Sequence, residues 1–123
     1  MIFANTDKEI TIIYSSEDRT GKQILAYAQS ERLPIHEVNV HKTKIPSSHW
    51  AELANRMGVD VKELVNVESS AYKQKFGADS DFNDHDWLSL LEKNPDVLRA
   101  PIVMKGKKVV FMSSPQEMFQ FIK

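Results

Sequence analysis

The polar segment that follows the first apolar run of this chain holds the side chains best suited to chemistry. It begins at Tyr14 and continues through Ser15, Ser16, Arg19 and Lys22. A serine or tyrosine hydroxyl can bind or activate a substrate when a base lies beside it, and the sequence places no base next to these three. The chain contains no cysteine, so it can form no disulfide and no thiolate metal site, and no thiol can carry a redox reaction.

A nucleotide site and a histidine metal site are both disfavoured by spacing. Gly21-Lys22 lacks the upstream glycine and the following serine or threonine of a P-loop. His36 and His41 are an odd number of residues apart, so they fall on opposite faces of an extended strand and cannot bind one ion. We interpret both as ordinary surface histidines.

The acidic stretch 79–86 holds the densest cluster of possible metal ligands in the sequence. An EF-hand would need glycine at its sixth position and glutamate at its twelfth, where this stretch has Asp84 and Leu90. Helix capping is the role we expect for it. No metal site is predicted.

The first third of the chain predicts a β-α-β unit. The β-branched run 10–14 is typical of a buried strand, and apolar residues recur at helical spacing from about Gly21 until Leu33-Pro34 ends the helix. A second strand is expected over 35–40. The right-handed crossover then makes the two strands parallel.

The middle third predicts a helical insertion, about 47–95. Ser47 or Ser48 can cap a helix that Gly58 ends in a left-handed conformation, and Asp60 can cap a short second helix. A third helix is expected to include 72–76. A fourth begins at Asn83 or Asp84 and ends at Asn94-Pro95.

The last third predicts a β-hairpin and a helix. Strands 101–104 and 109–112 flank Gly106-Lys107, which has the composition of a tight turn. Ser113 or Ser114 can cap the final helix, with Pro115 at its first position. We expect its inward-facing residues to be Met118, Phe119 and Ile122.

Length and charge exclude several classes of protein. A chain of 123 residues with 41% hydrophobic content suits one domain, and we expect residues 1–123 to form a single one. Sixteen basic against seventeen acidic residues give a formal charge of -1, so no basic field attracts nucleic acid, and direct nucleic-acid binding is not expected. No segment has the signature of a signal peptide or a membrane span, so we expect no membrane association and a cytoplasmic location.

Two stretches and the order of the elements resemble one family over roughly residues 9 to 122. The stretch 57–64 resembles the family's methionine-glycine pair leading into a short helix, and 94–103 resembles its His-Pro-x-Leu-x-x-Arg-Pro-Ile-Val region. Together with Tyr14 and the loop after it, these are similar to the arsenate reductase family, which also contains the Spx-type transcriptional regulators. The resemblance implies an α/β, thioredoxin-like fold: a mixed four-stranded sheet in the order β-α-β, helices, β-β-α.

The departures from this family lie where its chemistry is carried. The family's loop places a cysteine beside a helix N-terminus, and here Arg19 stands at or beside that position. A guanidinium cannot attack arsenic or sulfur. The arginines that hold arsenate in the family are also missing: Asn66 lies near one, Ala100 replaces another, and 111–114 contains none.

One feature of the family's site is retained in this sequence, the proline beside the active loop. Pro101 corresponds to the proline that thioredoxin-like domains hold in the cis form, so we expect a cis Ala100-Pro101 bond. The edge formed by Arg99, Ala100 and Pro101 could then pair with an extended peptide or with glutathione, or the proline could simply shape the turn. We expect this edge, the loop 15–22 and Ser113-Ser114 to converge.

Two classes of function remain. The first is a redox-inactive relative that binds an unidentified protein partner, with no cofactor. The second is a glutathione-dependent reductase or transferase that uses an external thiol. The hydroxyls of Tyr14, Ser15 and Ser16 could imitate the one that activates glutathione in some transferases, but serines that cap helices or order loops are commoner. Loss of the cysteine together with the arginines favours the first, because independent parts of one mechanism are absent together. Partner and oligomeric state are not encoded in any recognisable motif.

Overall fold

The computed structural model describes residues 9–15, 18–77, 82–99, 101–106 and 108–121. Their contacts divide the chain into two compact units, one made of the parts up to Thr43 and after Arg99, the other of Lys44–Arg99. Within the described residues, no helix is long and apolar enough to cross a membrane.

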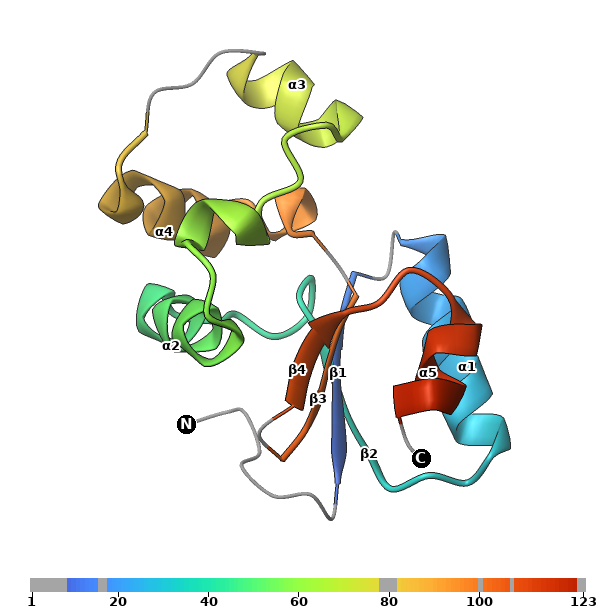
Figure 1. Cartoon of the computed structure of the whole chain (residues 1–123). Coiled ribbons are helices and arrows are strands. Elements are labelled where there is room, and N and C mark those ends of the chain that lie inside the picture. The colour runs from blue at the N-terminus through green and yellow to red at the C-terminus, as the bar shows by residue number, and fades with distance from the viewer. Residues whose placement is uncertain (1–8, 16–17, 78–81, 100, 107, 122–123) are drawn as a thin grey trace. The chain divides into compact units, whose positions relative to one another are not determined.

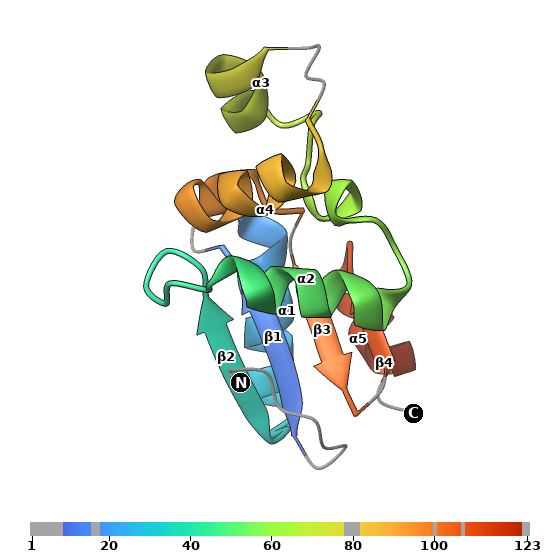
Figure 2. The same cartoon turned by 90° about the vertical axis from the view of Figure 1, so that its left-hand side faces the viewer.

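The first unit is built on a mixed four-stranded sheet (Figures 1 and 2). Its strands are β1 (Ile10–Tyr14), β2 (Ile35–Asn39), β3 (Ile102–Lys105) and β4 (Lys108–Phe111), in the order β2-β1-β3-β4. β1 runs parallel to β2 and antiparallel to β3, and β3 pairs antiparallel with β4. The predicted α/β class, the parallel β-α-β unit and the C-terminal hairpin are confirmed.

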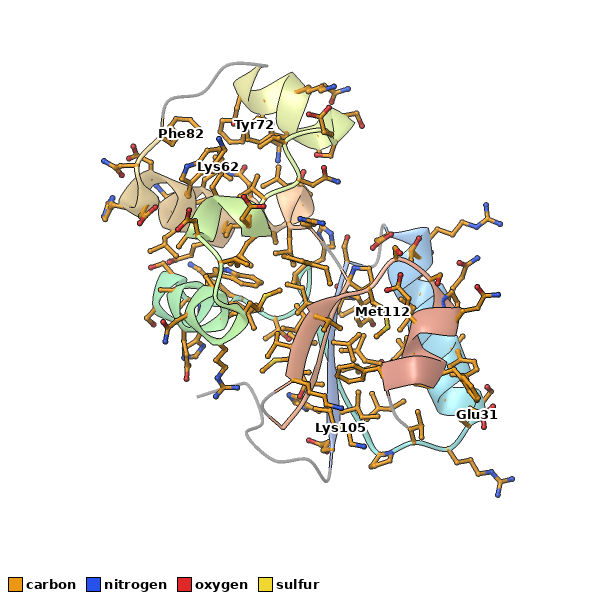
Figure 3. All side chains as sticks on the ribbon, in the orientation of Figure 1. Glu31, Lys62, Tyr72, Phe82, Lys105 and Met112 are labelled. Carbon is orange, nitrogen blue, oxygen red and sulfur yellow. The ribbon has the colours of Figure 1, made fainter. Side chains whose placement is uncertain are left out.

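Two helices cover one face of this sheet: α1 (Arg19–Ser30) and α5 (Pro115–Phe121), which pack against each other (Figure 1). Alternate residues of β1 point toward them, and Met112, labelled in Figure 3, extends from the end of β4 into the same core. Thr11 and Ile13 on the opposite face of β1 are also fully buried. Burial on both faces explains why this strand is an unbroken apolar and β-branched run. The buried cluster consists of Ile10, Ile12, Tyr14, Ile24, Ala28, Val103, Met112, Met118 and Phe121.

The regular elements described in the second unit are helices and 3₁₀ turns, apart from one isolated antiparallel bridge between Val65 and Leu98. The unit contains α2 (Ser47–Met57), the 3₁₀ turn η1 (Val61–Leu64), α3 (Ser70–Phe76), α4 (Asp84–Lys93) and the 3₁₀ turn η2 (Pro95–Val97). α4 packs against α2 and both 3₁₀ turns. Tyr72 of α3 lies over Trp87 of α4 with ring centroids 6.1 Å apart, and the Phe82 ring meets Trp87 edge-on at 5.0 Å (Figure 3). These aromatic contacts join α3 to the rest of its unit.

Several helix ends were predicted correctly from local sequence. Gly58 ends α2 with a φ of 70°, the left-handed conformation that glycine adopts most readily. Asn83 caps α4, and its side chain accepts the Asp86 N–H while the Asp86 carboxylate accepts the Asn83 N–H. This reciprocal pair is a capping box, and it uses part of the acidic stretch that we expected to cap a helix.

Other ends differ from prediction. α1 begins at Arg19, two residues before the expected Gly21, because Asp18 accepts the Thr20 N–H at 3.1 Å. The residue before α2 is Pro46 and not a serine, so no side chain caps this helix from that position. The Ser47 N–H instead donates to a carboxylate oxygen of Glu92 in α4, at 2.9 Å.

The last helix shows one error in the predicted core. Phe119 was expected to face inward but is 51% exposed, while Phe121 is buried. Met118 is fully buried, as predicted. α5 is only seven residues long, so a one-position error in its register moves an aromatic ring from the core to the surface. Ile122 lies outside the described residues.

Candidate functional site

One end of the sheet gathers most of the residues singled out in the sequence. Ile13 pairs with Ile102, and the antiparallel register carried one residue further places Pro101 beside Tyr14. The Met112 N–H donates to the Pro101 carbonyl oxygen at 3.0 Å, which brings the chain before Ser113 to the same end. The end of β1, Pro101 and the chain that leads into α5 therefore lie at the same end of the sheet.

The N-terminus of α1 forms a second side of this site. Asp18 caps the helix, Arg19 is its first residue, and the side chains of Arg19 and Lys22 are exposed. Gly21 is buried, and a Cβ placed on it would lie 3.0 Å from the Tyr14 Cβ. Glycine thus allows the first turn of α1 to lie directly on the end of β1.

Tyr14 keeps its proton at this position. Burial, and after it the negative charge of Glu37, raise the pKa of the Tyr14 hydroxyl above its ordinary value of 10.0. The phenol therefore remains neutral at physiological pH, and it is no nucleophile there. Its ring belongs to the apolar core beneath α1 and α5.

Ser15 has a partner that the sequence did not reveal. Its Oγ lies 2.7 Å from Nε2 of His41, in a partly buried hydrogen bond. The spacing of His36 and His41 had been interpreted as placing both on one strand. β2 ends at Asn39, however, so His41 lies beyond the strand. Because β1 and β2 are parallel neighbours and each residue follows a strand end, the sequence could have placed both at one end of the sheet, but not in contact with each other.

Not every predicted site residue can be placed here. Ser16 and Ala100 lie outside the described residues, and so does the predicted cis bond between Ala100 and Pro101. Arg99 belongs to the helical unit, where its Nη1 lies 3.9 Å from a Glu63 carboxylate oxygen. The convergence of Arg99 with the loop stays a prediction.

The position expected to replace one arsenate-holding arginine has a local structural role. Asn66 in the helical unit accepts the Glu68 N–H with its side chain, and its own N–H donates to the Val97 carbonyl. A short asparagine held in this way orders a loop and offers no guanidinium to an anion.

Residues 15–121 match the family model described as the ArsC family. The chain belongs to the ArsC family. Among curated proteins, it is 22% identical to the global transcriptional regulator Spx of Staphylococcus aureus, over 92% of this chain and 86% of that protein.

Solved structures agree on the fold of this ArsC-family chain. An arsenate reductase from Vibrio cholerae superposes with a TM-score of 0.78 at 15% identity, covering 92% of this chain and 97% of that one. A putative arsenate reductase from Yersinia pestis gives a TM-score of 0.78 at 20% identity, covering 90% and 98%. The thioredoxin-like fold implied by the sequence is therefore confirmed, and this ArsC-family member has it without any cysteine.

Proposed function

We propose that this protein is a redox-inactive member of the ArsC family that binds another protein and serves a regulatory role. The observation that carries the proposal is the arginine at the start of α1. Arg19 stands at or beside the family's cysteine position, in a chain without cysteine. Without a thiol, the chain cannot take part in the thiol–disulfide exchange on which a cysteine-based reductase depends.

The surroundings of Arg19 suit a polar peptide better than a free oxyanion. Its guanidinium and the Lys22 ammonium are exposed, but the Asp18 carboxylate lies at the same helix end. The Asp18 carboxylate weakens the attraction of these cations for a small anion, whereas a partner segment that presents both signs can pair with all three groups. The backbone next to Pro101 adds hydrogen-bonding groups that an extended peptide could use.

The similarity to a protein named a global transcriptional regulator supports a regulatory role over a metabolic one. A fold kept after its reactive group is lost is most simply explained by selection for binding. We infer that the protein acts in the cytoplasm.

Charge reversal at the helix end tests this proposal. Arg19→Glu and Lys22→Glu should reduce capture of partner proteins from a lysate of the native host, and the capture by unaltered protein should weaken as salt is raised. Thermal stability should stay unchanged, since exposed charges contribute little to folding. Lys93→Glu on the exposed surface of α4 is the matched control. If the first two variants capture partners normally and the control variant does not, the binding surface lies on the helical unit, and its proposed place at the start of α1 is wrong.

A glutathione-dependent activity is the second candidate, and the Ser15 hydroxyl is the observation that favours it. A hydroxyl hydrogen-bonded to an imidazole could orient an external thiol. Arsenate reduction with glutathione and glutaredoxin, together with glutathione conjugation, measures this directly. We expect background rates, and turnover that is abolished by altering this loop would establish the enzyme.

A further inference from the structure

The pair formed by Ser15 and His41 has a geometry that simple loop packing does not require. The bond joins Ser15 Oγ to the far ring nitrogen of the imidazole, Nε2, at 2.7 Å. A serine hydroxyl within hydrogen-bonding distance of an imidazole nitrogen is the arrangement in which imidazole acts as a general base toward serine.

Hydrogen bonds to nearby residues hold both members of the pair in place. The His41 N–H donates to Oδ1 of Asn39 at 3.0 Å, and the Ser15 carbonyl accepts the Asp18 N–H at 2.9 Å. Val40 donates its N–H to the Tyr14 carbonyl at 2.9 Å, which continues the β1–β2 pairing up to the pair itself. Ser15 and His41 are thus held from both strands.

The pair also lies where α/β proteins place ligands. Ser15 follows the carboxyl end of β1, whose two neighbours are β2 on one side and β3 on the other. His41 lies just past the carboxyl end of β2, the parallel neighbour of β1, and ligands of α/β proteins commonly bind outside the carboxyl ends of parallel strands. α1, with 12 residues, begins just after it, and the positive end of its dipole favours negative charge on a nearby carbonyl oxygen.

We propose that Ser15 and His41 are a nucleophile and general base that accept a small acyl group from an activated ester or thioester. Ser15 Oγ attacks the carbonyl carbon while its proton passes to His41 Nε2. The bond to the leaving group then breaks, and the alcohol or thiol departs with that proton, leaving an ester on Ser15. Water, giving its proton to Nε2, attacks this ester; the carboxylic acid leaves and the hydroxyl is restored.

Accessibility sets the class of acyl group. His41 is exposed, but Ser15 retains only 8% of its surface. Because so little of Ser15 is exposed, we expect only a short acyl group such as acetyl to reach its Oγ. Small activated acyl donors are therefore the substrates we expect.

Acetylation by p-nitrophenyl acetate tests the proposal on the full chain, with mass spectrometry to locate the acetyl group. We expect an acetyl ester on Ser15, absent in Ser15→Ala and formed about 100-fold more slowly in His41→Gln. His85→Gln, at an exposed histidine of α4, controls for general reaction with imidazole and should behave as the unaltered protein. An unmodified Ser15, or an equal rate in His41→Gln, overturns the proposal.

The absence of cysteine allows a second measurement that does not depend on an acyl donor. Ser15→Cys creates the single thiol of the chain, and we expect iodoacetamide to alkylate it several-fold faster when His41 is present than in the double variant with His41→Gln. Ser30→Cys, exposed at the end of α1, should react at the same rate with and without His41. Far-UV circular dichroism and the melting temperature identify variants that remain folded. No effect of His41 on the Ser15→Cys rate shows that the hydrogen bond only ties the loop to the end of β2.

Discussion

Gly21 offers a quantitative test of how α1 is seated on the sheet. Alanine at this position would place its Cβ 3.0 Å from the Tyr14 Cβ and 3.3 Å from Oδ2 of Asp18. Carbon atoms in comfortable contact are about 3.5–4.0 Å apart. The Tyr14 Cβ is attached directly to the backbone of β1 and cannot rotate away, so α1 itself must move.

Two opposing free energies decide the outcome of Gly21→Ala. Replacing glycine by alanine within a helix stabilises it by up to about 1 kcal/mol. Forcing an extra methyl group into a closely packed site destabilises by about 1–3 kcal/mol. We therefore expect Gly21→Ala to lower the free energy of unfolding by about 1 kcal/mol, although helix propensity alone predicts the opposite sign.

Urea unfolding of two matched variants separates these contributions. Ala26→Gly, at an exposed position of the same helix, should lose about 1 kcal/mol from propensity alone. Gly58→Ala should lose about 1–2 kcal/mol from backbone conformation alone, since its φ is 70° and nothing lies within 4 Å of the new Cβ. If Gly21→Ala instead stabilises the protein by about as much as Ala26→Gly destabilises it, α1 does not rest on Tyr14 and the packing argument is wrong.

Three further predictions concern the caps and the lost chemistry. Hydrogen bonds to Ser47 lower the pKa of the Glu92 carboxyl from 4.5, so the stability that this group contributes is complete above pH 4.5 and is lost as the carboxylate is protonated at lower pH. Glu92→Gln should therefore be less stable than the unaltered protein at pH 7, and the difference should shrink toward pH 3. A difference that stays constant with pH would exclude this cap. Asn83→Ala should lose about 1 kcal/mol in urea unfolding, because it removes the cap of α4; an unchanged midpoint would contradict it. Arg19→Cys should give a thiol with a pKa below about 8.5, measured as the alkylation rate against pH. Arsenate reduction by this variant should stay at background, because the arginines that orient the anion are absent. Efficient reduction would show that the cysteine was the one group missing.

Local sequence was sufficient to predict most elements of this fold. The β-branched run of β1, the glycine that ends α2 and the asparagine that caps α4 each act through the backbone within a few residues, so their effects do not depend on distant parts of the chain. The sequence by itself also determined what the protein cannot do. The absence of cysteine is a matter of composition, and no folding can supply a thiol.

Only the tertiary structure decided which polar groups meet. Ser15 and His41 are 26 residues apart, and Ser47 and Glu92 are 45 residues apart. Each contact depends on strand register or helix packing, in which a shift of one residue turns a side chain to another face. The same sensitivity explains Phe119, whose apolar character predicts burial but whose position in a seven-residue helix turns it toward solvent. Sequence determined the elements and the missing reactive group, because both depend on residue type and near neighbours. The candidate site required the tertiary structure, because its hydrogen bonds join residues that only folding brings together.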